Sequence, residues 1–565
     1  MSQTRYQAPL SAWISALEKG SLRPQLAGYY GAGETARWED RYLEALRAFA
    51  ARCGGQGEVV VARCPAQMNL MGMHIDYGGM PSLRLAVRGA DTLAIARPNA
   101  DGRVRLHSLM RAPGEAEDRF APAEFDLHDL VPAERVANRQ ALMDYAARVD
   151  RSHLADGWAV LPQGGLLFLE SYFRERRPLR GMDCLVWSNV SPSGGMSSSS
   201  ALVIASAYAA MGASGLVPGV DMPEEDLVDG IGTSEWIRGT RGGTADHGGM
   251  ILGKTGKVVS VGVFPARSLG YATLPEAYAA LILDSGVPRV YDEAVKEETV
   301  IAYPLGVFVI GQLILPRLVR TPGFEGLAPD YLQRIQYIRD ITCQHLGLGL
   351  PQFYQVLQAL PQTTTLAEVE AQAGAAYAPF HQQQIGGRFQ RIGPDYPIRL
   401  RRRFVFGLAE QDRVRAMLEY LNAGRLATAL ELVQLAHDGD LDREVSDEDL
   451  ERRRGAALAG EEAGQLCFVP GGYGRMTPAY DRVVRVINQY LAEQGGPEAG
   501  AVQRLGAGWG GNVGGLVRRD FLSGQGRPGF QALLREELGI AADLDQAQAL
   551  PGEGACLLPA PGGAA

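Results

Sequence analysis

A glycine- and serine-rich run at residues 192–200 separates a strand pattern from an apolar helix pattern, and it most limits how this chain can fold. Residues 182–190 are typical of a strand, and residues 201–210 are typical of a buried helix. Glycines let the backbone approach a ligand closely, and serines at a helix start lie beside N–H groups that have no intrahelical partner. The run therefore predicts a phosphate site, although it also fits a turn that only caps a helix.

The length and charge of the chain bound its domain number and its partners. With 565 residues, 46% of them hydrophobic and 21% charged, we expect a globular protein of two or three domains. The 55 basic and 64 acidic side chains give a net charge of −9, which argues against a nucleic-acid partner. A phosphate ligand stays compatible with this charge, because a phosphate site is local.

Cysteine spacing, the N-terminus and the most apolar run bear on the compartment. The six cysteines show no CxxC spacing, which favours reduced thiols without a zinc site. Residues 1–19 lack the pattern of a signal peptide. Residues 299–316 are interrupted by Pro304 and Gln312, so we expect a buried core helix there rather than a membrane span. These features predict a cytoplasmic protein without a membrane partner.

Hydrophobic periodicity predicts a mixture of strands and helices. We expect helices at 36–52, 327–360, 410–436 and 530–538, strands at 58–63, 81–87, 92–96, 103–106 and 555–558, and irregular insertions at 382–397 and 451–475.

Two stretches match phosphate-binding motifs by letter but not by context. Residues 248–255 match the P-loop pattern, which requires a preceding strand and a following helix, yet 256–261 favour a turn into a strand. Residues 506–511 match the dinucleotide fingerprint, yet 512–517 continue as a glycine-spaced apolar run rather than a helix. We therefore predict that neither stretch performs the function its letters suggest.

Three polar residues, His74, Asp76 and Tyr77, stand close together after the strand predicted at 58–63. A carboxylate accepts hydrogen bonds from neighbouring hydroxyls, and His and Tyr donate or accept, so the set suits a polyol or sugar. The same residues also fit a turn in which Asp76 caps the bend at Gly78 and Gly79.

Residues 64–79 resemble the sugar-binding signature of galactokinases, which belong to the GHMP small-molecule kinase superfamily. The run at 192–200 resembles the second superfamily motif, residues 242–247 resemble the segment with the catalytic aspartate, and residues 506–511 resemble the third motif. Four resemblances in the family's order imply an α+β, two-domain, GHMP-kinase-like fold with the active site in the inter-domain cleft. We expect an N-terminal domain at 1–270, a C-terminal domain at 271–558 and a loose tail at 559–565.

The resemblance also implies roles for individual residues. Asp246 and Gln67 are the expected catalytic residues, and the expected sugar contacts are Met73, His74, Asp76, Tyr77 and Gly243. ATP is expected on Gly194, Gly195, Ser197, Ser198, Ser199, Gly508, Gly510 and Gly511, with Mg²⁺ on Ser198 and Glu235. Asp246 would accept or orient the proton of the anomeric hydroxyl as its oxygen attacks the γ-phosphate.

Three positions depart from the family's pattern. Gln67 stands where the family has an arginine, Met73 where it has a glutamate, and His247 where it has a glutamine. Methionine is a poor acceptor for a sugar hydroxyl, so we expect a pentose such as arabinose, or a 6-deoxy sugar such as fucose, in preference to galactose. The alternative is that Met73 faces the core and that His247 or Arg84 contacts the sugar.

The function implied by the resemblance is ATP-dependent phosphorylation of a monosaccharide, at the anomeric hydroxyl. Because Gln67 supplies no charge, the alternative is a catalytically weak or inactive sugar and ATP sensor on the same scaffold. The expected partners are a monosaccharide and Mg²⁺-ATP, without nucleic acid or membrane, and the expected state is a monomer or homodimer.

Overall fold

The computed structural model describes residues 5–110, 118–129, 131–132, 134–136, 138–190, 195–239, 242–290, 292–386, 389, 391–474, 476–506 and 510–562. The chain divides into two compact units. The first unit comprises Met1–Asn69, Arg84–Leu274 and Ala549–Ala565, and the second comprises Leu70–Leu83 and Pro275–Gln548.

This division differs in two places from the domains predicted at 1–270 and 271–558. The loop at 70–83, which contains four of the five predicted sugar contacts, belongs to the second unit, because Ile75 and Met80 are fully buried in that unit's apolar core. The C-terminal segment belongs to the first unit, because strand β13 (Cys556–Leu557) pairs with β2 and Leu557 lies in the first unit's core. The two compact units therefore differ from a contiguous two-domain division at both places.

The described residues of the first unit form a nine-stranded sheet with the order β1-β2-β3-β6-β4-β5, in which β13 also pairs with β2, and β7 pairs with both β3 and β8. Most of the pairings that define it are antiparallel, while β4 and β6 are parallel. The bounds are β1 (Ala8–Pro9), β2 (Glu58–Met71), β3 (Ser82–Pro98), β4 (Arg103–Leu109), β5 (Ala123–Asp126), β6 (Met182–Ser188), β7 (Lys257–Gly262) and β8 (Arg267–Thr273).

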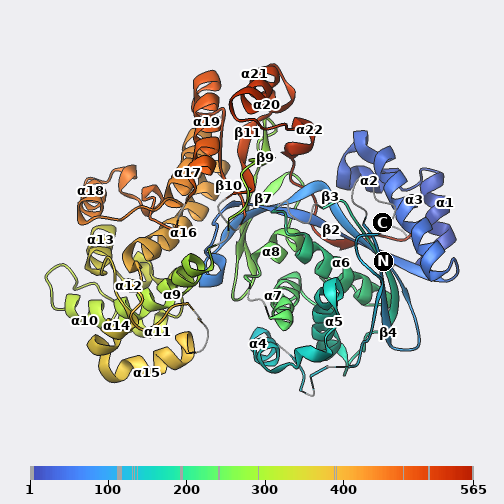
Figure 1. Ribbon diagram of the computed structural model, residues 1–565, viewed down its shortest axis with the longest axis horizontal. Helices are drawn as coiled ribbons and strands as arrows, with labels where there is room; N and C mark the ends of the chain where they lie inside the picture. The colour runs from blue at the N-terminus through green and yellow to red at the C-terminus, as the bar shows by residue number, and fades with distance from the viewer. Residues whose placement is uncertain are drawn as a thin grey trace. The chain divides into compact units, whose positions relative to one another are not determined.

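Helices cover both faces of this sheet (Figure 1). Val59 and Val61 of β2 pack in the cluster formed with α1–α3, whereas Val60 and Ala62 pack in the cluster formed with α5–α8. Alternate residues of a strand point to opposite faces, so a sheet covered on both sides needs a nearly continuous apolar strand. The helices are α1 (Leu10–Glu18), α2 (Arg23–Tyr30), α3 (Thr35–Cys53), α4 (Arg139–Arg148), α5 (Val160–Phe173), α6 (Ser198–Ala213), α7 (Glu224–Ser234) and α8 (Ala245–Ile251).

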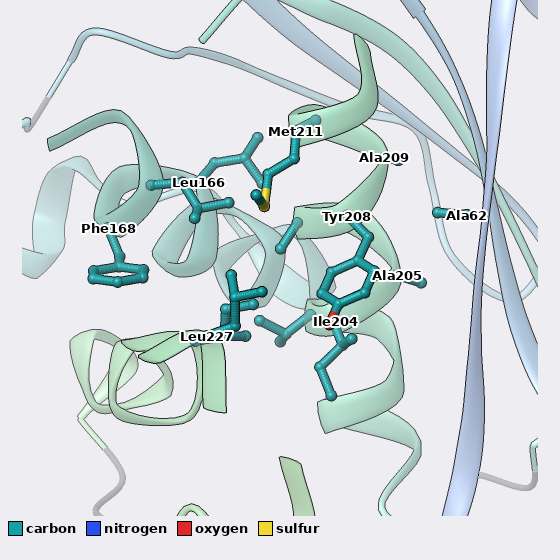
Figure 2. Packing of buried hydrophobic residues seen from close by; sticks show 14 of the residues in the cluster. Ala62, Leu166, Phe168, Ile204, Ala205, Tyr208, Ala209, Met211 and Leu227 are labelled. Carbon is teal, nitrogen blue, oxygen red and sulfur yellow. The ribbon is translucent and has the colours of Figure 1, made fainter. Parts of the chain in front are cut away.

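Helix α6 lies at the centre of the helices α5–α8 that cover one face of the sheet. Ile204, Tyr208 and Met211 of α6 pack among Leu166 of α5 and Leu227 of α7 (Figure 2). Such a helix is apolar all round because it is surrounded by protein, as the sequence predicts for 201–210. Its buried body fixes the position of its N-terminus.

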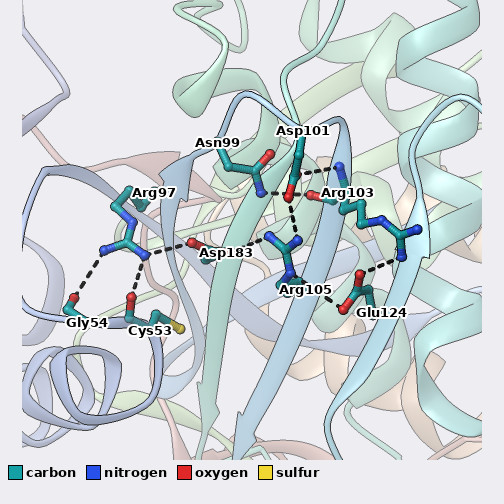
Figure 3. Close-up of polar contacts among 9 residues, drawn as sticks. All are labelled: Cys53, Gly54, Arg97, Asn99, Asp101, Arg103, Arg105, Glu124 and Asp183. Carbon is teal, nitrogen blue, oxygen red and sulfur yellow. Dashed lines mark hydrogen bonds and ion pairs between the residues drawn. The ribbon is translucent and has the colours of Figure 1, made fainter.

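Charged side chains at one edge of the first unit form an ion-pair network that is separate from the core (Figure 3). Arg97 of β3 and Arg105 of β4 both bind Asp183 of β6, and Arg105 also pairs with Asp101 and Glu124. These side chains are partly exposed, and partly exposed pairs contribute little individually. We interpret this network as a solvated cluster at one end of these three neighbouring strands.

The described residues of the second unit contain a four-stranded sheet with the order β10-β11-β9-β12 and many helices. The strands are β9 (Tyr278–Asp284), β10 (Gly500–Arg504), β11 (Asn512–Arg518) and β12 (Gln548–Ala549). The helices are α9 (Glu293–Val309), α10 (Leu315–Leu318), α11 (Tyr331–Arg334), α12 (Cys343–Leu346), α13 (Leu350–Ala359), α14 (Leu366–Ala373), α15 (Tyr377–Phe380), α16 (Leu400–Asn422), α17 (Leu426–Gly439), α18 (Asp447–Leu458), α19 (Pro478–Gly495), α20 (Arg519–Ser523), α21 (Arg527–Ala532) and α22 (Leu544–Ala547). The whole is an α+β fold, as predicted.

Two apolar or irregular stretches of the second unit test the sequence predictions. Among the described residues, one helical stretch, Glu293–Leu318, is both long enough and apolar enough to cross a membrane. Its residues Ile301 and Leu305 lie in the apolar core of the unit, as expected for a buried helix. The irregular insertion predicted at 451–475 is wrong in its first part, which belongs to α18. Ser446 begins this helix with a capping box to Asp449, and acidic residues fill its first turn.

Candidate active site

Four polar side chains from four elements of the first unit form a closed ring of hydrogen bonds. Gln67 lies on β2, Arg84 on β3, Ser197 at the N-cap of α6, and Asp246 on α8. Arg84 Nη1 donates to Gln67 Oε1 at 2.9 Å and also to Asp246 Oδ1. Gln67 Nε2 donates to Ser197 Oγ at 3.0 Å, and Ser197 Oγ donates to Asp246 Oδ2. The two predicted catalytic residues and one predicted phosphate-loop serine are therefore brought together.

The ring fixes the charge state of Asp246. Burial alone would raise the pKa of Asp246, but the charge of Arg84 and the hydrogen bond from Ser197 outweigh it, so the pKa lies below its ordinary value. The Asp246 side chain is 36% exposed, whereas that of Arg84 is only 4% exposed. The arrangement presents an ionised carboxylate that is held from behind and still accessible from one side.

Ser197 adopts a backbone conformation that favours glycine. Its φ is +58°, and His74, Ser197 and Phe264 are the non-glycine residues of the described chain with positive φ. Such a conformation costs about 1–3 kcal/mol and persists only where the surroundings hold it. Here the backbone N–H of Gln67 donates to Met196 O at 3.3 Å, and the Ser197 hydroxyl is fixed in the ring. Gly195 precedes this turn with a φ of +66°.

The two residues predicted to hold Mg²⁺ lie on different elements, Ser198 at the start of α6 and Glu235 directly after α7. Ser198 begins the helix, and Glu235 Oε1 accepts a hydrogen bond from Ser200 Oγ at 3.0 Å and lies 2.9 Å from His247 Nε2. Ser199 lies in the same first turn, and Gly243 lies just before α8. No group of three or more His, Cys, Asp or Glu side chains suited to a metal occurs in the described part of the chain.

Four of the five predicted sugar contacts, all except Gly243, lie on a loop of the second unit, which is anchored by α16. Glu410 Oε1 accepts hydrogen bonds from the N–H of Gly72 at 2.9 Å and of Met73 at 3.3 Å. Glu410 Oε2 pairs with Arg413 Nε at 2.6 Å, and both side chains are buried. Met73 is only 4% exposed. A carboxylate thus lies beside position 73, but its oxygens are used within the fold.

The aromatic residues of this loop are packed against the second unit. The His74 ring stacks on Tyr473 with 4.4 Å between centroids, and Tyr77 stacks on Tyr303 at 5.9 Å. Burial, with the charge of Arg504, holds the pKa of His74 well below its ordinary value, so the imidazole is neutral. Asp76 begins a short helical turn and is half-buried, and its Oδ1 accepts from the N–H of Tyr77 at 3.1 Å.

The glycine-rich run near residue 510 is shaped by its own backbone neighbours. Gly511 N–H donates to Val287 O at 2.8 Å, and Ser285 N–H donates to Gly511 O at 3.0 Å. A Cβ at Gly510 would lie 2.2 Å from Pro288 O, so packing alone requires glycine there. The predicted ATP contacts Gly194 and Gly508 lie outside the described residues.

Both motif matches that we set aside have the predicted context. Residues 248–255 follow the start of α8 and precede strand β7, so they do not join a strand to a helix. Lys254 Nζ instead lies 4.4 Å from the centre of the Tyr271 ring. Residues 506–511 are followed by strand β11 rather than by a helix.

Sequence reasoning missed the roles of Arg84 and Glu410. The sequence suggests Arg84 only as an alternative sugar contact, whereas the structure pairs it with Asp246. The available signal was a charged residue within the apolar run at 82–87, because a buried charge needs a partner. Glu410 gave no comparable signal for its role in the loop, since the two loop N–H groups that it binds lie 338 and 337 positions away in the sequence.

Comparison with known proteins covers both halves of the ring. Residues 47–98 match the galactokinase galactose-binding signature, and residues 166–254 match the GHMP kinases N terminal domain. The first range contains Gln67 and Arg84, and the second contains Ser197 and Asp246.

Relatives and solved structures agree with these matches. The galactokinase of Candida maltosa is 26% identical over 225 residues, which cover 40% of this chain and 92% of that protein. The galactokinase of Candida parapsilosis is 24% identical over 298 residues, which cover 52% of this chain and 53% of that protein. Lactococcus lactis galactokinase complexed with galactose aligns with a TM-score of 0.54 and 18% identity, over 92% of this chain and 100% of that one. The chain therefore has the fold of that galactokinase, and it is similar to galactokinases over residues 47–98 and to the GHMP kinases over residues 166–254.

Proposed function

We propose that this protein is an ATP-dependent sugar kinase that phosphorylates a monosaccharide at its anomeric hydroxyl, with Asp246 as the catalytic carboxylate. The observation that carries the proposal is the ring around Asp246, which keeps the carboxylate ionised and oriented while leaving it 36% exposed. A carboxylate held in this way can accept a proton from a hydroxyl or orient it for attack.

The phosphates of ATP would be bound by the 194–199 loop and the N-terminus of α6. A helix of this length presents unpaired N–H groups and a positive dipole end at its start. Ser198 and Glu235 offer the hydroxyl and carboxylate oxygens that suit Mg²⁺, which commonly keeps several waters and binds substrate phosphates. When bound, Mg²⁺ would neutralise charge on the phosphates.

The proposed transfer balances without any further reactant. The sugar oxygen forms a bond to the γ-phosphorus of ATP, and the bond from that phosphorus to the β–γ bridging oxygen breaks. The hydroxyl proton passes to Asp246 and then to solvent, and ADP leaves. The residues of the ring act by holding Asp246, so that attack occurs from a fixed position.

The sugar would be held by the loop that carries His74, Asp76 and Tyr77. The two Candida relatives compared above are named galactokinases, which supports a hexose of the galactose type. Met73, however, offers no strong acceptor, and the nearby carboxylate of Glu410 is used by the fold. We therefore propose that a sugar without a hydroxyl at carbon 6, such as arabinose or fucose, is preferred.

The second candidate function is a sugar and ATP sensor without turnover. Gln67, which carries no charge, favours it. Arg84 weakens this argument, because a guanidinium is present beside Asp246 even though position 67 lacks one.

One experiment separates these functions. Purified protein is incubated with Mg²⁺-ATP and a panel of free monosaccharides, and ADP release is measured. We expect release with at least one sugar, and we expect Asp246→Asn to abolish it while the melting temperature changes by only a few degrees. Ligand-induced thermal stabilisation without ADP release for any sugar would favour the sensor instead.

A further inference from the structure

The positive charge beside Asp246 comes from β3, whereas the family's motif has its arginine at the position of Gln67 on β2. The chain has no arginine at position 67, yet a guanidinium reaches Asp246 from β3, which is the neighbour of β2 in the sheet. Its Nη1 bridges Asp246 Oδ1 and Gln67 Oε1. Gln67 uses its carbonyl on Arg84 and its amide on Ser197, so it links the other members of the ring.

The packing around Arg84 is consistent with a built position. A Cβ at Gly249 of α8 would lie 3.1 Å from Arg84 Cβ, 3.2 Å from its Cδ and 3.4 Å from Gln67 Cβ. Contacts of this length are tight, so glycine at 249 leaves room for the stem of Arg84. Because Arg84 is almost fully buried, a charge there without Asp246 would be costly.

We propose that Arg84 is the positioning residue that supplies the positive charge beside Asp246, and that Gln67 orients Arg84 and Ser197 in place of carrying that charge. This inference rests on the proposed function for its kinetic consequences. The charged or titratable groups that face Asp246 are Arg84 from β3 and His247 from α8, and Ser197 adds a hydroxyl from α6. Arg84 makes the direct ion pair.

The test moves the charge between the two strands. Arg84→Gln removes it, Arg84→Lys keeps a charge without the planar fork, and Gln67→Arg with Arg84→Gln transfers it to β2. Arg97→Gln is the matched control, because Arg97 also lies on β3 and pairs with an aspartate, Asp183. For each variant kcat, its pH profile and the melting temperature are measured.

We expect Arg84→Gln to lower kcat by about 100-fold, which is the lower end of the effect of a positioned acid–base group. The acidic limb of the profile should move to higher pH, since Asp246 loses the charge that favours its ionised form. Arg84→Lys should keep the limb near its wild-type position, and the double variant should recover at least about tenfold of the lost kcat. Equal kcat and equal pH profiles for Arg84→Gln and Arg97→Gln would overturn the proposal.

A readout without turnover separates this inference from the proposed function. Carbodiimide coupling to Asp246, followed by peptide mass spectrometry, requires the protonated carboxyl and can be measured against pH. Coupling that begins at higher pH in Arg84→Gln than in the wild type supports the role of Arg84 even if no sugar is phosphorylated. Unchanged coupling contradicts it, and Arg84→Met, which also removes the charge, replaces Arg84→Gln if the latter does not fold.

Discussion

The clearest stability prediction concerns Glu410, which ties the loop at 70–83 to α16. Replacing Glu410 with alanine removes the acceptor of two buried N–H groups and leaves Arg413 without its carboxylate. Loss of one partner of a buried ion pair costs about 3–5 kcal/mol. We expect about 3 kcal/mol here, the lower end, because Arg413 still donates to the carbonyls of Cys467 at 3.2 Å and Val469 at 2.7 Å.

Hydrogen–deuterium exchange with peptide mass spectrometry measures this effect locally. The N–H groups of Gly72 and Met73 each lose a hydrogen bond worth about 1–3 kcal/mol when left unpaired, so their exchange should accelerate by about 5- to 150-fold. Glu410→Gln keeps an acceptor and loses the charge, so we expect an intermediate effect. A local measurement is preferable because a chain of two compact units need not unfold in one step.

Glu419→Ala provides a matched control on the same helix. Glu419 pairs with Arg415 at 2.8 Å, but its side chain is 58% exposed, and exposed pairs contribute about 0–1 kcal/mol. Exchange of the peptide that contains Gly72 and Met73 should stay unchanged in this variant. The reasoning is refuted if that peptide exchanges as slowly in Glu410→Ala as it does in Glu419→Ala.

Three further predictions concern single side chains. Lys254→Ala should leave the affinity for Mg²⁺-ATP nearly unchanged, because Lys254 lies over the Tyr271 ring, whereas Ser198→Ala should weaken that affinity. Isothermal titration measures both affinities, and it would show the reverse pattern if the P-loop match were functional. Burial holds the pKa of His74 below 6.5, so below that pH the unfolded chain binds a proton that the folded chain rejects, and stability falls as pH falls. The melting temperature of His74→Phe should therefore drop less than that of the wild type between pH 7 and pH 5, and equal drops would contradict this. Met73→Glu should raise kcat/KM for galactose relative to arabinose, and a wild-type preference for galactose would sink the sugar proposal.

Local sequence patterns predicted three residues of the ring, but they did not predict which residue supplies its positive charge. Asp246, Gln67 and Ser197 each stand in a motif that can be read over a few residues. Arg84 joins them through the pairing of β2 with β3, which the sequence does not specify. Two strands were predicted where β3 is a single strand through Gly89, because pairing within the sheet outweighs a local turn signal. The fold class followed from the motifs, while the unit that holds the loop at 70–83 depended on packing.

The position of a charge in space matters more for the mechanism than its position in a motif. Gln67 by itself argues for a protein that binds without turnover, since a neutral amide cannot keep a carboxylate ionised. The structure pairs Asp246 with Arg84 instead, and the Coulomb interaction depends on the distance between the charged groups rather than on the strand that carries them. A single substitution at position 67 therefore does not discriminate an enzyme from a sensor. The joint behaviour of positions 67 and 84 does, because only a relocated charge predicts that moving it back to β2 restores activity.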